Sequence, residues 1–486
     1  MGDVGMGQLT GLRVSSPSTC SADAARLPIG RLALGTILFS AAGGIELANE
    51  GTGSPLATVL MVVCLLISLL LLWTAVTRRP APLVKQNGSR RLGRLCVLWS
   101  LVVCATMTLA LGVGLIVTNE PSHAYGSDAA AFNHYNAKLV LDGVNPYTAD
   151  NRFWDAVAEF PNAGATPLRR GLYADSRFGP SLTQLVRDVR AEVAHPNRRG
   201  PEFEPASLHS YPALAFLVNV PVIGLGFPTT LPVMLMALAG LWLAVAWGAS
   251  AGDRIVVWLA LLSNPLLVLL TLRGSFDVLA LLPALLAWRT LERRRLSPCL
   301  LGIACAVKQI VWPLVPFYAI VVWRRDGPRE AARRLALAGV TFVIPNAPFM
   351  LMSPGAWAHS MFLPMTLPIF PSGIGLVALA RAGLLPLFPS AVYGALELIA
   401  LAALLVWFAR AKSFPRPEIA LLLGLFPYLL AWHSATTYFA ALPILAVYAT
   451  VTAAKHRSED PASHTTTLAP GVAEASGAIP SVATPT

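Results

Sequence analysis

The sequence predicts an all-α protein that crosses the membrane many times. First, 55% of the 486 residues are hydrophobic and only 13% are charged, whereas soluble domains carry about 25% charged residues. Second, apolar runs recur along the chain with the length that a membrane-spanning helix needs. Third, basic residues cluster between these runs, which is typical of loops that stay in the cytoplasm. We therefore expect a polytopic transmembrane helix bundle of about 10 to 13 helices.

The N-terminal part of the chain sets the expected topology. Residues 1–26 are rich in Gly, Ser and Ala without periodicity, which predicts a disordered tail. Three spans are predicted, of which the first is short, and the segment between the second and third holds six basic residues and no acid, so we place it in the cytoplasm. The third span then leads outward, and the chain that follows it is expected to form an extracytoplasmic loop. The spans are 31–47, 55–76 and 95–117, and the loop is 118–210.

The loop opens with a carboxylate and a predicted helix. Asp128 lies about ten residues past the third apolar run and therefore close to the bilayer surface. Side-chain packing does not explain a carboxylate at such a position. Apolar residues recur at helical spacing after it, which predicts a short amphipathic helix over 129–141 lying on the membrane. Asp128 is therefore the first candidate for chemistry, and the alternative is an N-cap aspartate of a surface helix. The apolar face of this helix consists of Phe132, Tyr135, Leu139 and Val140. The helix is expected to end at Asp142–Gly143 and to be followed by a turn at Asn145–Tyr147. A second surface helix is predicted after Pro180.

The rest of the membrane domain follows from the same reasoning. Prolines and glycines in 211–227 predict an interfacial or re-entrant helix in place of a full crossing. A break with the sequence Arg-Gly-Ser-Phe-Asp at 273–277 is expected on the outer side. The membrane domain covers 27–457, a disordered tail covers 458–486, and both termini are expected in the cytoplasm. The predicted spans are 229–249, 255–272, 278–288, 335–352, 391–409, 418–432 and 438–454, with an outer loop at 353–373 and a re-entrant piece at 373–388.

The apolar run 298–323 has an unusual charge pattern. Basic clusters flank it on both sides, so it starts and ends in the cytoplasm and cannot be one crossing. We predict two short helices that meet near Lys308, which places this lysine at membrane depth toward the outer face. Inserting a charged lysine at this depth costs about 3 kcal/mol of free energy, so we expect Lys308 to pair with either an anionic ligand or an internal carboxylate. Both alternatives stay open.

Four polar groups are expected to meet at the outer face: Asp128, the 273–277 break, Lys308 and His433. One acid with several cations suits phosphate chemistry, because Asp128 can accept a proton from an acceptor hydroxyl while Lys308, Arg273 and His433 stabilise a departing phosphate. Taken alone, His433 is more typical of an interfacial histidine. The six cysteines show no metal-binding spacing, and a metal is not required. The basic clusters are better explained by topology than by nucleic-acid binding.

Several segments carry a resemblance to a known group. SDAAAFNHYNAKLVLDGVNPY, SYPALAFL and LLGIACAVKQIVWPL resemble segments of the GT-C glycosyltransferases that use polyprenyl-phosphate sugars, and within them glycosyltransferase family 87. The resemblance covers about 95–450. The family's break commonly carries Gly-Gln with a nearby Asn, where this chain has Gly274-Ser275-Phe276-Asp277.

The resemblance implies a GT-C-like fold and an inverting transfer of a hexosyl group such as mannose. The expected donor is a polyprenyl-phosphate sugar, and the expected acceptor is an envelope glycolipid or glycan. The donor is a substrate, and no cofactor is expected. Asp128 matches the catalytic base and Lys308 a lipid-phosphate contact. Candidate substrate-binding residues are Tyr135, Asn145, Tyr147, Tyr211, Asp277 and Tyr438.

Two other functions are compatible with a polytopic bundle. A secondary transporter or lipid flippase would commonly show internal repeats and a site near the membrane midplane. This chain instead has one large asymmetric loop and polar groups at one face. A non-catalytic envelope assembly protein that kept the fold is the third candidate. We rank the transferase first.

Overall fold

A computed structural model describes the chain over residues 28–49, 54–77, 125–148, 166–176, 209–246, 264–411 and 416–459, with isolated residues at 113 and between 156 and 194. The described part is almost wholly helical, as predicted. Within the described residues, five helices are long and apolar enough to cross a membrane: Gly30–Asn49, Pro55–Thr77, Pro328–Met352, Ser390–Arg410 and Thr436–Ala453. The predicted all-α class is therefore confirmed, and the length and composition of these helices suit a membrane protein.

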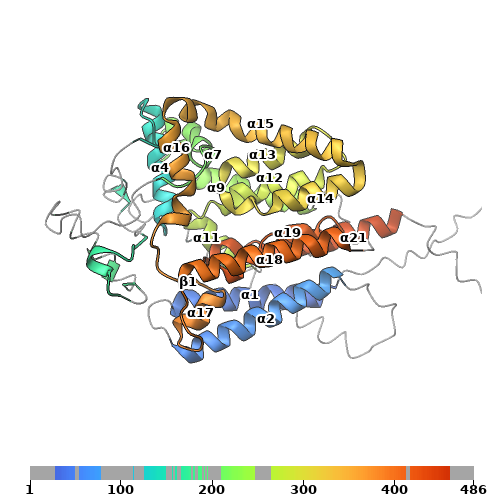
Figure 1. Cartoon of the computed structure of the whole chain (residues 1–486), viewed down its shortest axis with the longest axis horizontal. Helices are drawn as coiled ribbons and strands as arrows, with labels where there is room; N and C mark the ends of the chain where they lie inside the picture. The colour runs from blue at the N-terminus through green and yellow to red at the C-terminus, as the bar shows by residue number, and fades with distance from the viewer. Residues whose placement is uncertain are drawn as a thin grey trace, which may run out of the picture.

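The long helices run side by side along one direction (Figure 1). One group comprises α9 (Leu231–Ala246), α12 (Asp277–Arg289), α13 (Leu296–Val307), α14 (Leu314–Asp326) and α15 (Pro328–Met352). The other comprises α1 (Ile29–Asn49), α2 (Pro55–Thr77), α18 (Ser390–Arg410), α19 (Ile419–Leu423) and α21 (Leu442–Glu459).

Short elements gather across one end of the bundle, which we call the α4 end (Figure 1). This end carries α4 (Asp128–Leu141), α7 (Leu214–Leu217), α8 (Val220–Gly224), α16 (Pro354–Thr366), α17 (Leu376–Arg381) and the strand β1 (Ser372–Gly373). Strand β1 pairs in parallel with β2 (His433–Ser434). The remaining elements are α11 (Pro265–Leu272), α20 (Thr436–Phe439) and the 3₁₀ turns η2 (Gly171–Tyr173), η4 (Gln309–Val311) and η5 (Phe426–Leu430).

Close helix packing depends on a glycine at the contact of α13 with α15. A Cβ atom at Gly302 would overlap the backbone carbonyl oxygen of Ala338. The two helices therefore approach each other with backbone against backbone at this position, which fixes how α13 lies against α15.

Helix breaks fall where the sequence predicts them. α11 ends before Arg273 and α12 starts at Asp277, with Gly274 at a φ of 87°, a conformation that glycine adopts without strain. α13 ends at Val307, Lys308 is extended, and α14 follows after η4, so the predicted break near Lys308 is confirmed. The chain at 211–227 forms two short helices and no full crossing, also as predicted.

Other boundaries were wrong. α1 is longer than the short first span expected, and α15 begins directly after α14 at Pro328, inside the segment taken as a cytoplasmic loop. The expected outer loop at 353–373 contains the helix α16, because Pro354 lies in its first turn, where a proline does not break a helix. The expected span 438–454 matches the apolar helical stretch Thr436–Ala453, which contains α20 and α21, whereas the expected span 418–432 is divided between α19 and η5. The expected span 95–117, the second surface helix and both tails fall largely outside the described residues.

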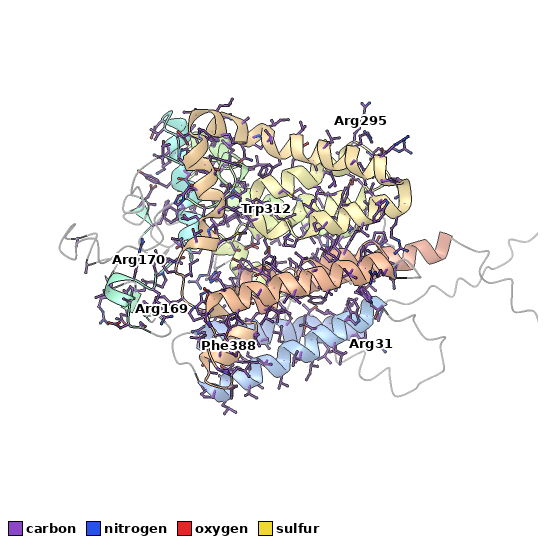
Figure 2. The ribbon with its side chains drawn as sticks, in the orientation of Figure 1. Arg31, Arg169, Arg170, Arg295, Trp312 and Phe388 are labelled. Carbon is purple, nitrogen blue, oxygen red and sulfur yellow. The ribbon has the colours of Figure 1, made fainter. Side chains whose placement is uncertain are left out.

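The end of the bundle opposite α4 is held by a buried arginine. The side chain of Arg334 donates hydrogen bonds to Asp326 Oδ2 at 2.9 Å, to Glu330 Oε1 at 2.8 Å and to the Leu291 carbonyl oxygen at 2.7 Å. Figure 2 shows Arg31 and Arg295 at this end as well. Arg334 thus ties the α12–α13 turn to the α14–α15 turn.

Candidate functional site

Asp128 is the first residue of α4 and not its cap. Ser127 occupies the N-cap position, so the alternative of an N-cap aspartate was wrong. Asp128 Oδ1 accepts a hydrogen bond from the Ala129 N–H at 2.7 Å, and Oδ2 accepts one from Thr166 Oγ1 at 2.6 Å. Burial raises the pKa of Asp128 above its ordinary value, against the opposing effect of these hydrogen bonds. The carboxylate is thus partly shielded from solvent and has one hydroxyl donor.

α4 is buried nearly all round, which corrects the prediction of an amphipathic surface helix. Its polar residues Asn133, His134 and Asn136 are as buried as its apolar face. His134 Nδ1 shares a hydrogen bond with the Tyr125 hydroxyl at 2.8 Å, and Asn136 Nδ2 donates to His209 Nδ1 at 2.7 Å. Burial lowers the pKa of both histidines to about 3, so both are neutral at neutral pH. The polar side chains of α4, which we expected to be exposed to water, therefore form hydrogen bonds with residues of other segments.

Arg273 lies beside the start of α4. The Gly126 N–H donates to the Arg273 carbonyl oxygen at 2.9 Å, and a Cβ atom at Gly126 would overlap Arg273 Nε. Arg273 is exposed, and no residue in the described part of the chain forms an ion pair with its guanidinium. Arg273 therefore lies beside Gly126, which precedes Asp128 by two residues in the turn that leads into α4.

Lys308 forms a buried ion pair. Its Nζ lies 2.7 Å from Asp277 Oδ1, and the two side chains are 9% and 5% exposed. Ser275 Oγ donates to the other oxygen, Asp277 Oδ2, at 2.7 Å. Of the two alternatives for Lys308, the structure therefore contains the internal carboxylate, and the pair joins the break before α12 to the break after α13.

Three aromatic rings surround the Lys308 ammonium. Its Nζ lies 4.4 Å from the ring centroid of Phe276, 5.5 Å from that of Tyr438 and 5.6 Å from that of Tyr211. Rings at these distances attract a cation through their quadrupoles. We call Lys308, Asp277 and these three rings the lysine cage.

Tyr211, one ring of the lysine cage, also feels the charge of Asp128. Burial raises the pKa of Tyr211 well above its ordinary value, and the charges of Asp128 and Asp277 raise it further. Both carboxylates are therefore near enough to act on one phenol. The Tyr147 hydroxyl donates a hydrogen bond to the Tyr211 carbonyl oxygen at 2.9 Å, and Asn145 Oδ1 accepts one from the Tyr147 N–H at 3.0 Å. Asn145 and Tyr147 thus support Tyr211, while Tyr135 lies partly buried in the middle of α4.

His433 reaches the same region through the β1–β2 pair. Its Nδ1 shares a hydrogen bond with Ser372 Oγ at 2.6 Å, and its ring centroid lies 6.1 Å from that of Tyr438. Burial lowers the pKa of His433 to about 4, with the Lys308 charge as the second cause. His433 is therefore neutral at neutral pH, which corrects its expected role as a cation. It offers a hydrogen bond and no charge.

The structure brings Asp128, Arg273, Lys308 and His433 to the α4 end. Thr166, Ser275 and Ser372 were not predicted, since a hydroxyl in a loop carries no pattern that marks it. Glu397 was not predicted either, although an acid within the apolar run 391–409 is itself a signal. Within the described ranges, no three His, Cys, Asp or Glu side chains are placed to hold a metal ion.

The arrangement combines a half-buried acid with a hydroxyl donor, an exposed cation beside it and a buried ion pair a short distance away. It can accept a proton from a hydroxyl at Asp128 and offer positive charge at Arg273. No protein-family model, no curated protein and no solved structure matches the chain.

Proposed function

We propose that the chain is a membrane glycosyltransferase that transfers a sugar, with mannose as the expected one, from a polyprenyl-phosphate donor to a hydroxyl of an envelope glycolipid or glycan. Asp128 acts as the general base. The observation that carries the proposal is the hydrogen bond from Thr166 Oγ1 to Asp128 Oδ2. A serine-like hydroxyl that donates to a partly buried carboxylate has the geometry that an acceptor hydroxyl needs with its base.

The proposed reaction needs one base and a stabilised leaving group. The acceptor oxygen attacks the anomeric carbon, its proton passes to Asp128, and the bond between that carbon and the phosphate oxygen breaks with inversion. The electron pair leaves with the lipid phosphate, which gains a negative charge. Arg273 is the described cation best placed to meet this charge, since Lys308 already pairs with Asp277. His433 contributes a hydrogen bond.

We assign the α4 end to the extracytoplasmic face and both termini to the cytoplasm. Arg31 and Arg295 lie at the opposite end of the bundle (Figure 2), and basic residues favour the cytoplasmic side. A cysteine placed in 77–93 should then react with membrane-impermeant maleimide only after the membrane is opened. Labelling in intact cells would reverse this orientation.

A lipid flippase or secondary transporter is the second candidate. The Lys308–Asp277 pair favours it, because ion pairs at breaks in membrane helices are typical of transport sites. A transporter would move donor lipid across proteoliposome membranes without releasing polyprenyl phosphate, whereas a transferase releases polyprenyl phosphate in proportion to the sugar moved.

The test uses purified protein in lipid with polyprenyl-phosphate mannose and a cell-envelope lipid extract. We expect transfer by the wild type and a loss of at least about a hundredfold in Asp128→Asn, the low end for a missing general base. Asp142→Asn is the matched control, because Asp142 is an exposed carboxylate at the other end of α4. Lys308→Ala should also lose transfer. If Asp128→Asn transfers sugar as well as Asp142→Asn does, Asp128 is not the base.

A further inference from the structure

A carboxylate lies inside the candidate span α18. Glu397 follows the first two turns of this helix, whose neighbouring residues are apolar. It is partly buried, yet nothing in the described ranges donates a hydrogen bond to its carboxylate or pairs with it. An acidic side chain within the membrane is costly, so such groups tend to face a partner or a ligand.

Two tyrosines lie within reach of this carboxylate. Helix α18, which carries Glu397, packs against η5, which contains Tyr428, and the charge of Glu397 also influences the phenols of Tyr428 and of Tyr438 in α20. The two rings have centroids 5.5 Å apart and are tilted by 56°. Neither phenol hydroxyl has a hydrogen-bond partner among the residues that the structure describes. Three hydrogen-bonding groups therefore lie together without protein partners in an apolar helix bundle.

This group of three is continuous with the lysine cage. The ring of Tyr438 lies 5.5 Å from Lys308 Nζ, while the Glu397 charge also reaches its phenol. Tyr438 also lies beside His433, with ring centroids 6.1 Å apart. A ligand that contacts Glu397, Tyr428 and Tyr438 would consequently lie next to the lysine cage.

We infer that Glu397, Tyr428 and Tyr438 form a carbohydrate subsite for the sugar ring of the lipid donor. The inference rests on the proposed function and adds to it the groups that recognise the sugar. A carboxylate accepts hydrogen bonds from neighbouring sugar hydroxyls, and phenols donate or accept them. Aromatic rings also pack against the apolar C–H face of a pyranose. The ring belongs to the donor and not the acceptor, because the anomeric carbon is bonded to the phosphate and must stay beside the cations that hold it.

The test separates sugar binding from lipid-phosphate binding. Wild type and variants are reconstituted in nanodiscs, and the affinities for polyprenyl-phosphate mannose and for sugar-free polyprenyl phosphate of the same chain length are measured. We expect Glu397→Gln to weaken binding of the mannosyl lipid by about tenfold or more and to leave binding of the sugar-free lipid unchanged. Tyr428→Phe, which keeps the ring and removes the hydroxyl, should weaken binding of the mannosyl lipid alone by a smaller factor. Leu398→Gln is the control, since Leu398 is 68% exposed on the same helix, and it should change neither affinity.

Each other outcome has a definite meaning. Equal weakening of both lipids, or of neither, by Glu397→Gln overturns the subsite while leaving the proposed function in place. An increase in KM for the acceptor with no change for the donor also overturns it, because the ring bound there would then be the acceptor's. If the wild type binds neither lipid and releases no polyprenyl phosphate, the proposed function itself fails.

Discussion

Replacing Thr166 with valine removes one hydrogen bond from Asp128 while keeping a β-branched side chain of similar size. Thr166 Oγ1 donates to Asp128 Oδ2 over 2.6 Å, and the Ala129 N–H remains on Oδ1. A hydrogen bond to a charged group contributes about 1.5–3 kcal/mol, and one pKa unit corresponds to about 1.4 kcal/mol. The valine variant should therefore raise the pKa of Asp128 by about one to two units.

The sign of the change in activity follows from the role of a base. Asp128 acts only when ionised, so transfer falls as the pH drops through its pKa. Burial already raises this pKa, and the loss of the Thr166 hydroxyl raises it further. We expect the acidic limb of the kcat/KM profile for sugar transfer to move upward by about one to two pH units, with rates within severalfold of the wild type on the alkaline side.

Thr166→Ser keeps the hydroxyl and is the control for the pH profile. Its acidic limb should coincide with that of the wild type. The reasoning is refuted if the limb of Thr166→Val stays in place or moves downward. A loss of equal size at every pH would also refute it, because it would show that Thr166 supports the loop and does not act on the ionisation of Asp128.

The other predictions concern stability and packing. Gly302→Ala should lower the thermal midpoint in detergent, since a Cβ atom there meets a backbone carbonyl and overpacking costs about 1–3 kcal/mol, whereas Gly339→Ala on α15 has open space and should not lower it. Lys308→Met should also lower the midpoint, because an unpaired buried Asp277 costs about 3–5 kcal/mol, and adding Asp277→Leu should recover most of the loss; a double variant less stable than either single variant would contradict this. Gly373→Ala, at a φ of 106° against a carbonyl of β2, should raise hydrogen exchange across β1, and unchanged protection would refute the pairing constraint.

The sequence predicts the fold where charge and backbone chemistry act locally. The break at Lys308 followed from basic residues on both sides of one apolar run, and the break before Asp277 followed from its Gly-Ser pair. α16 was not predicted because the Ser353-Pro354-Gly355 sequence at its start is as typical of a loop as of a first helical turn. These local signals predict where helices end, but they do not predict which residues pack against each helix face.

The site was less predictable because its contacts join distant residues. Thr166 meets Asp128 across 38 positions, and Asn136 meets His209 across 73. Helical periodicity predicted a wet face for α4, but those long-range partners bury it. The partner of Lys308 was equally unpredictable. The position of Lys308 in an apolar run shows that burying its charge is unfavourable, but it does not show whether a ligand or Asp277 pairs with that charge.

The charges at the α4 end limit how a phosphate can bind there. Among the residues predicted to meet the lipid phosphate and the base beside it, Asp128 and Asp277 are carboxylates, Arg273 and Lys308 are cations, and His433 is neutral. The sum is zero, so a lipid phosphate would add uncompensated negative charge unless a cation is released from its partner. Asp277 holds Lys308 at 2.7 Å and is itself held by Ser275. Binding of the donor and exchange of Lys308 between Asp277 and the phosphate should thus be coupled, and Asp277→Asn should bind sugar-free polyprenyl phosphate more tightly than the wild type does.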